Sequence, residues 1–249
     1  PTNIRKGNPY INPEYSNNLE FNYLKTWEYH TISLGAFYTY TEDVIQQIQK
    51  LADNGVMETT YGNITYSQSA GLDLTVKNRL FNNYLDLTTT ATAYYYQLGE
   101  NKEYNIPKTE TFSWNVRLNA NVKIINNLSA QLTGYYNSPR LVAQGSMGHR
   151  YGMDIGIKAS FLEKALNLSF TVRDVLNSRS KSTRETWGDN FYQENGNISS
   201  GRSYRLTLSY NFGNMGKKRP PKGNQGMNGN MGSEMGGMDG MGGDMMTDF

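Results

Sequence analysis

Polar and apolar residues alternate along most of this chain. The clearest stretch is Gly201–Phe212, where from Ser203 onward small polar or charged residues at odd positions alternate with large apolar residues at even positions. A period of two is typical of a β-strand with one apolar side. About ten such residues also match the length of a tilted strand that crosses a bilayer. The stretch therefore indicates a membrane-spanning strand.

The same alternation predicts nine strands that follow one another as an antiparallel up-and-down meander. Their expected bounds are Tyr15–Lys25, Thr31–Thr41, Ile64–Lys77, Tyr84–Gln97, Thr111–Ile125, Leu128–Tyr136, Arg150–Phe161, Leu166–Val175 and Gly201–Phe212. One piece of the second connection, Asp43–Leu51, fits either a helical turn or an extension of the second strand. Asn126 and Asn127 form a two-residue turn signal between the fifth and sixth strands.

The connections alternate in length. Those after the first, third, fifth and seventh strands are short, whereas those after the second, fourth, sixth and eighth are long. Transmembrane barrels have short periplasmic turns at one end and long extracellular loops at the other. The predicted fold class is therefore all-β, a meander of about nine strands that forms part of a transmembrane β-barrel over residues 15–213.

The two ends of the chain differ from this pattern. Residues 1–14 carry three of the seven prolines and predict an irregular lead-in. Residues 214–249 are rich in glycine and methionine and predict a disordered tail. Alternatively, the regularly spaced tail methionines could bind Cu(I) through their thioethers, although the intervening glycines disfavour a helical stripe.

Composition narrows the function. The mean hydropathy is −0.67, and no stretch approaches the roughly 18 apolar residues of a transmembrane helix, but alternation keeps a β-barrel polar on average. A net charge of +2 gives no large field for nucleic acid, and the absence of cysteine excludes disulfides and thiolate chemistry. No catalytic motif is present, so we expect neither an enzyme nor a cofactor.

The face opposite the apolar one carries charges that suit a wet lumen, because a midplane Arg or Lys on the lipid face costs about 2–4 kcal/mol. The expected lumen wall comprises Arg117, Lys123, Asp154, Lys158, Arg173 and Arg205. Pairs such as Asp154 and Lys158 are expected to form a solvated, salt-bridged wall rather than an acid–base site. Aromatic residues are expected to form two interfacial girdles, with Tyr94, Tyr95, Tyr96 and Tyr136 among those at the long-loop ends.

Three stretches carry a family resemblance. GNPYINPEYSNNLEFNY (Gly7–Tyr23) resembles the segment that opens the last barrel strands of TonB-dependent outer-membrane receptors, with Ile11 and Asn12 as departures. LSFTVRDVLNSRS (Leu168–Ser180) resembles the penultimate strand of that family, with Asp174 in place of an asparagine. SYRLTLSYNFG resembles its closing strand, and a Met/Gly tail after that strand resembles the Bacteroidetes-type outer-membrane β-barrel branch.

The resemblance implies the C-terminal portion of an outer-membrane receptor that takes up a bulky nutrient, such as a siderophore or an oligomeric substrate. It implies outer-membrane lipid, further N-terminal strands, a plug, TonB acting through a region absent from this chain and a surface lipoprotein as partners, with the tail in the periplasm. Two alternatives stay open: a non-transporting barrel that displays its loops for adhesion or assembly, and a soluble β-sheet domain. In the partial barrel, the outer edges of Tyr15–Lys25 and Gly201–Phe212 are expected to be unpaired.

The long loops hold the expected ligand-binding residues. The loop 184–198 combines Trp187, Phe191 and Tyr192 with acids and amides, and exposed aromatics in a long loop suit ligand capture. Arg140 and His149 belong to another long connection at the same rim. His30 belongs to the opposite rim, so the two histidines are not expected to share a metal ion.

Overall fold

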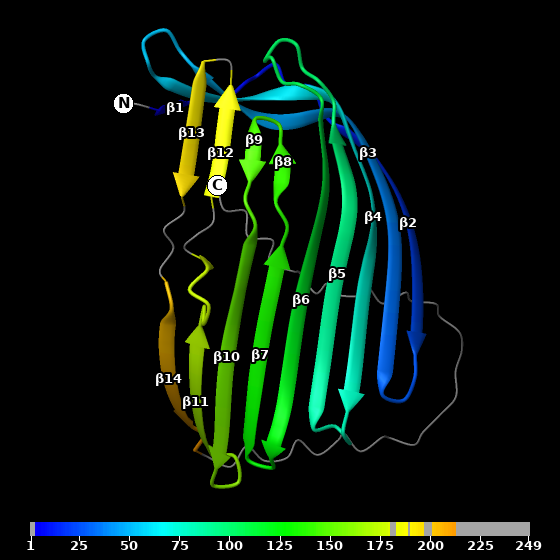
Figure 1. The fold of residues 1–249 in the computed structure, drawn as a ribbon, viewed down its shortest axis with the longest axis vertical. Helices are drawn as coiled ribbons and strands as arrows, with labels where there is room; N and C mark the ends of the chain where they lie inside the picture. Colours follow the sequence, from blue (N-terminus) through cyan, green and yellow to red (C-terminus); the bar gives the residue numbers. More distant parts are fainter. Residues whose placement is uncertain (1–2, 180–182, 189, 197–200, 213–249) are drawn as a thin grey trace, which may run out of the picture. The chain divides into compact units, whose positions relative to one another are not determined.

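Nine strands pair in the order β14-β11-β10-β7-β6-β5-β4-β3-β2 in one antiparallel sheet (Figure 1). The computed structural model describes residues 3–179, 183–188, 190–196 and 201–212. The strands are β2 (Tyr15–Thr26), β3 (His30–Leu51), β4 (Met57–Leu80), β5 (Leu85–Leu98), β6 (Thr109–Ile125), β7 (Leu128–Asn137), β10 (Arg150–Phe161), β11 (Leu166–Arg173) and β14 (Ser203–Tyr210). The predicted all-β meander is confirmed. The tail expected over 214–249 lies outside the described residues.

The pairing aligns the apolar residues of successive strands in continuous rows. One row crosses six strands through Tyr23, Leu34, Leu74, Ala91, Val116 and Tyr136. Large side chains on this face stay exposed, including Leu72 at 56%, Phe112 at 64% and Leu206 at 70%. An apolar sheet face of this size that covers no core suits contact with lipid.

The second long connection differs from the helical alternative. β3 continues to Leu51 and pairs with β4 from Met57 onward, so Asp43–Leu51 is a strand extension and the helical-turn interpretation is wrong. Asp43 has φ 50° between the pairs Glu42↔Tyr66 and Val44↔Ile64. Figure 1 shows β3 and β4 bending away from the direction of the main sheet at this end.

Four further strands lie in segments that the sequence predicted as loops. They are β8 (Arg140–Val142), β9 (Gly145–Met147), β12 (Thr183–Gly188) and β13 (Phe191–Gly196), and they form a second sheet in the order β13-β12-β9-β8. β1 (Asn3–Arg5) pairs in parallel with Met57–Thr59 of β4, so the lead-in is not wholly irregular.

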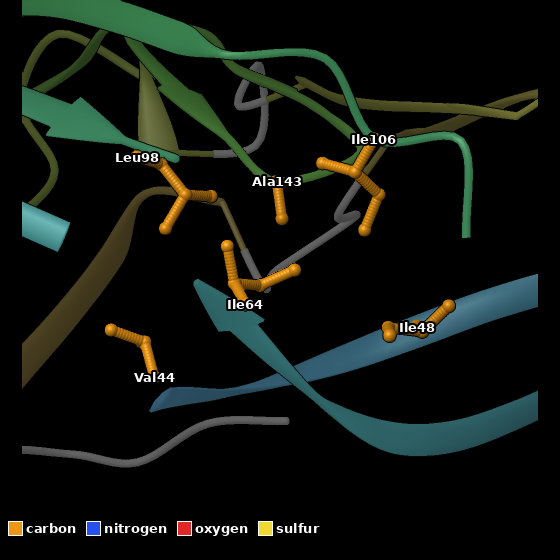
Figure 2. Packing of buried hydrophobic residues seen from close by; sticks show 6 residues of the cluster. All are labelled: Val44, Ile48, Ile64, Leu98, Ile106 and Ala143. Carbon is orange, nitrogen blue, oxygen red and sulfur yellow. The ribbon is translucent and has the colours of Figure 1, made fainter. Parts of the chain in front are cut away.

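The described residues place their buried apolar cluster at the long-loop end. We name it the cap core, and its members are Val44, Ile48, Ile64, Leu98, Ile106 and Ala143. Figure 2 shows these side chains coming from β3, β4, the end of β5 and two connecting segments. The side-chain amide of Gln144 also joins the segments: its Oε1 accepts the backbone N–H of Gln49 at 2.7 Å, and its Nε2 donates to the Gln49 carbonyl at 3.1 Å.

The main sheet ends at β2 on one side and at β14 on the other. Within the described part of the chain, no strand pairs with the outer edge of either one. Every residue of both strands is exposed. The unpaired edges predicted for these two strands are therefore present.

Candidate functional site

The polar face of the main sheet carries the residues expected for a lumen wall. Arg117 lies opposite Tyr135, which lies opposite Gly152. Lys123 and Lys158 lie on either side of Ser129 in another row, and Arg205 lies opposite Thr171, whose other partner is Gly156. These pairings put the predicted wall residues on one face, as the alternation requires.

Asp154 does not pair with Lys158. Its two carboxylate oxygens each accept a hydrogen bond from Arg179 Nη2 at 2.9 Å, and its Oδ1 also accepts the backbone N–H of Asp174 at 2.8 Å. The Arg179 guanidinium lies 5.5 Å from the centre of the Tyr135 ring. Both charged side chains of the pair are about three-quarters buried, with exposures of 29% and 25%. Sequence reasoning missed Arg179 because it follows β11 at the start of a long loop.

Asp174 fixes the turn that brings Arg179 back to the wall. It is 1% exposed, has φ 52°, and accepts hydrogen bonds from the backbone N–H groups of Ser178 at 2.9 Å and Arg179 at 3.2 Å. Burial alone would raise the pKa of this carboxyl, but the hydrogen bonds from Ser178 and Arg179 and the Arg179 charge outweigh burial and lower the pKa. The carboxylate therefore stays ionised at neutral pH.

Two adjoining cavities of about 250 and 280 Å³ lie at the long-loop end of the polar face and share Tyr94 and Arg140. The first is also lined by Asn115, Asn137, Met147 and Arg150, and the second by Gln46 and Tyr96. Arg140 Nε and Nη2 each lie 3.2 Å from Met147 Sδ. Guanidinium, phenol and amide groups thus converge at the long-loop end of the polar face.

Tyr94 and Tyr96 line these cavities instead of forming part of an interfacial girdle, which corrects the sequence interpretation. Tyr95 belongs to the apolar face, because it pairs with Ala70 and Phe112. The alternation of β5 could have separated the three tyrosines, because neighbouring residues of a strand point to opposite faces.

His149 does not join Arg140. Its ring stacks on Tyr151 at 5.7 Å and on Tyr136 at 6.5 Å, and Tyr136 stacks on Trp114 at 4.7 Å. Tyr136, Tyr151 and Trp114 belong to apolar-face rows of the sheet. His149 is therefore part of an aromatic group on the apolar face, and we no longer include it in the candidate ligand site.

The predicted aromatic loop forms the β12–β13 hairpin. Trp187 and Tyr192 face each other across it, with exposures of 38% and 62%. Phe191 pairs with Gly188 on the opposite face, and its ring occupies the space that a Gly188 side chain would need. The hairpin thus offers Trp187 and Tyr192, but not Phe191, on one exposed side.

A cavity of about 650 Å³ lies at the short-turn end of the polar face. Lys123, Lys158 and Lys164 line it together with the amides of Asn82, Asn83, Asn126, Asn127 and Asn167, and none of the described residues that line it is acidic. Lys164 was not predicted, because it belongs to a turn and not to a strand.

The described part of the chain contains no cluster of three or more metal-ligating His, Cys, Asp or Glu side chains. None of its segments is a helix long and apolar enough to cross a membrane.

Comparisons with known proteins give the chain its family. No curated protein matches it. The siderophore receptor PirA of Pseudomonas aeruginosa matches with a TM-score of 0.55 and 15% identity over 82% of this chain and 31% of that one. The copper transporter OprC matches with a TM-score of 0.62 and 12% identity over 82% of this chain and 33% of that one. The ferric yersiniabactin uptake receptor FyuA of Yersinia pestis matches with a TM-score of 0.57 and 16% identity over 80% of this chain and 30% of that one.

The chain thus spans about a third of the length of these structures. The similarity to receptor barrels that the sequence motifs predicted is confirmed at the level of fold. The model of the outer membrane protein beta-barrel family matches residues 1–210, and the matched proteins are receptors and transporters rather than enzymes. The chain therefore belongs to the outer membrane protein beta-barrel family.

Proposed function

We propose that this chain forms the C-terminal part of an outer-membrane receptor barrel that admits a bulky nutrient, such as a siderophore or an oligomeric substrate. The observation that carries the proposal is the open sheet: β2 and β14 are exposed along their whole length, and no strand of the described residues pairs with their outer edges. In lipid, backbone groups at such edges must find partners. Further strands of the same receptor supply those partners in this proposal.

In this proposal, the polar face and the long-loop end bind the nutrient. In the proposal, Trp187 and Tyr192 capture the nutrient by stacking, and Arg140 holds it within the cavities that also contain Tyr94. A plug, TonB acting through a region outside this chain and a surface lipoprotein complete the machinery, and the tail extends into the periplasm. The Met/Gly tail favours the Bacteroidetes-type branch.

The proposal is tested in cells that express the encoding gene together with its upstream coding sequence. Radiolabelled ferric siderophores and fluorescent oligosaccharides serve as probes, and uptake is measured with and without TonB. We expect TonB-dependent uptake of one probe class, reduced several-fold by Trp187→Ala combined with Tyr192→Ala. A matched variant is Phe191→Ala, which changes the opposite face of the hairpin. An upstream sequence without a plug and a TonB box would refute TonB-driven transport.

The alternative is a non-transporting barrel that displays its loops. The second sheet favours this alternative, because contacts with neighbouring segments hold the β12–β13 hairpin in place for a partner to bind. The β12–β13 hairpin is joined to β9 over Arg184–Thr186, and Asn190 Nδ2 donates to the Leu51 carbonyl at 3.3 Å. Cell adhesion that is lost in the Trp187 and Tyr192 double variant, without any uptake by the wild type, would select this alternative.

A further inference from the structure

Basic residues recur in every row along one part of the polar face. β6, β7, β10, β11 and β14 place six basic residues and one acidic residue on this face. We name the six the basic ladder: Arg117, Lys123, Arg150, Lys158, Arg173 and Arg205. The acid is Asp154, which Arg179 already binds. The polar face of β2 to β5 is more balanced, counting β3 up to Glu42 and β4 from Ser67. It carries three acidic residues, Glu20, Asp73 and Asp86, and two basic residues, Lys77 and Arg79.

The strand register distributes the basic ladder over successive rows, and we call each row with its basic side chains a step. Along β10, Arg150 occupies the first polar-face row, and Arg117 belongs to the next row through Tyr135 and Gly152. Arg173 follows Val172, the partner of Ile155, and so belongs to the row of Asp154. Arg205 shares the row of Gly156, and Lys123 shares the row of Lys158. Each polar-face row from Arg150 to Lys158 thus holds a basic side chain.

The steps lie within one to two Debye lengths of one another. Successive rows are roughly 7 Å apart along a strand, and neighbouring strands are roughly 5 Å apart. Successive steps lie one to three strands apart, with Arg117 on β6 and Arg173 on β11 the most distant, which gives separations of roughly 8 to 16 Å. The Debye length is about 8 Å at physiological ionic strength. Within the described residues, none of the six basic groups forms an ion pair with a carboxylate. The ladder therefore presents uncompensated positive charge along the height of the sheet.

The two ends of the ladder open into cavities that continue its chemistry. Arg150 lines the 250 Å³ cavity together with Arg140 at the long-loop end. Lys123 and Lys158 line the 650 Å³ cavity together with Lys164 at the short-turn end. A charged wall of one sign raises the local concentration of ions of the opposite sign.

We propose that the basic ladder selects an anionic cargo, a molecule that bears several carboxylate or phosphate groups, and guides it along the lumen from Arg150 to Lys158. This rests on the proposed receptor function. An anion with charged groups roughly 8 to 12 Å apart can contact two neighbouring steps at once at most points of the ladder, and the widest gap, between Arg117 and Arg173, is roughly 16 Å. Guanidinium groups at the entrance bind oxyanions in a fixed geometry, whereas the lysines at the other end act as point charges that release them more easily.

Binding to the purified full receptor in a non-ionic detergent tests the ladder. The probe is pyrene tetrasulfonate, which is planar and fully ionised, and its fluorescence anisotropy is followed at low salt. We expect saturable binding that weakens with added salt and that citrate displaces, whereas the same concentration of neutral sucrose does not. Citrate carries carboxylates and the probe carries sulfonates, so displacement reports the charge and not one functional group.

A matched pair of double variants locates the effect. Arg117→Gln with Arg150→Gln removes two steps of the ladder, and Lys77→Gln with Arg79→Gln removes the same charge from the polar face of β4. One charge about 7 Å away in a water-filled lumen changes affinity roughly threefold per probe charge. We therefore expect at least tenfold weaker binding for the first variant and less than threefold for the second.

Equal losses in the two double variants, or no binding by the wild-type protein, would overturn the proposal. Heat-modifiable gel mobility confirms that each variant is folded, and Arg117→Lys with Arg150→Lys should restore most of the binding. Anion binding without cellular uptake of any probe would refute the transport proposal alone. Uptake of a neutral oligosaccharide, at a rate unchanged by removal of the two steps, would refute the ladder alone.

Discussion

Replacing Ile48 with alanine tests whether the cap core holds the long-loop end together. Ile48 is 0% exposed, and its Cδ1, together with the Tyr104 ring, fills the space that a Gly62 side chain would need. The cap core has six members, so few other contacts can compensate for the loss. Truncating a buried isoleucine to alanine destabilises a protein by about 2–5 kcal/mol. For Ile48 we expect the local free energy of unfolding to fall by about 3 kcal/mol.

Hydrogen exchange of the cap amides measures this loss. The backbone N–H of Gln49 donates to Gln144 Oε1, and Asn101 and Ile106 exchange backbone hydrogen bonds at 2.9 and 2.8 Å. If these amides exchange by opening of the cap, about 3 kcal/mol corresponds to exchange roughly a hundredfold faster. Amides in the β6–β7 pairing should not change, because neither strand contributes a side chain to the cap core.

The matched control is Ile45→Ala, which removes the same atoms from the same strand at a side chain that is 36% exposed. It should change exchange at the cap amides by less than a few-fold. If Ile48→Ala leaves the exchange of Gln49 and Ile106 unchanged, or if both variants accelerate it equally, the cap core does not hold this region together.

Three further experiments test the two faces of the sheet, the turn at Asp174 and the packing of the polar face. Leu206→Arg, on the apolar face, should cost about 2–4 kcal/mol and reduce the heat-modifiable fraction in membranes, whereas Thr207→Arg on the polar face should not. The folded state lowers the pKa of Asp174, so its contribution to stability is present above the ordinary aspartate pKa of about 3.9 and is lost as the pH falls below it; Asp174→Asn should flatten this part of the stability curve, measured by tryptophan fluorescence. Gly152→Ala should lower the temperature at which the protein changes to its unfolded gel mobility, because the new Cβ would lie 2.8 Å from the Tyr135 ring. Gly156→Ala should be tolerated, because the nearest atom to its new Cβ is 3.7 Å away.

The strands of the main sheet were predictable because a period of two is a local signal that long spanning strands repeat many times. Arg150–Phe161 was predicted to the residue, and Thr111–Ile125 to within two residues at one end. The wall residues were predictable for the same reason, since alternation alone places Arg117 and Lys158 on one face. Strand pairing then puts each residue in a row, which no single strand reveals.

The cap was not predictable in this way. β8 and β9 have three residues each, which is too short for a period to be visible. Asp43–Leu51 has apolar residues at spacings that also fit a helical turn, and only its pairing with Met57–Ile64 selects the strand. Arg179 reaches Asp154 only because Asp174 turns the chain with a positive φ. These outcomes depend on contacts between segments far apart in the sequence.

The open edges of the main sheet lead to the last prediction. β2 has 12 residues and β14 has 8, and at an edge about half of the backbone N–H and C=O groups of such strands have no partner in the sheet. Each unsatisfied group costs several kcal/mol in hydrocarbon, so the unpaired edges strongly disfavour insertion of the isolated chain into lipid. We therefore expect the isolated chain to aggregate through these edges in micelles, as size-exclusion chromatography with light scattering would show. A stable, monodisperse monomer would contradict this, unless cysteines placed in β2 and β14 cross-linked readily, which would show that the two edges close on each other.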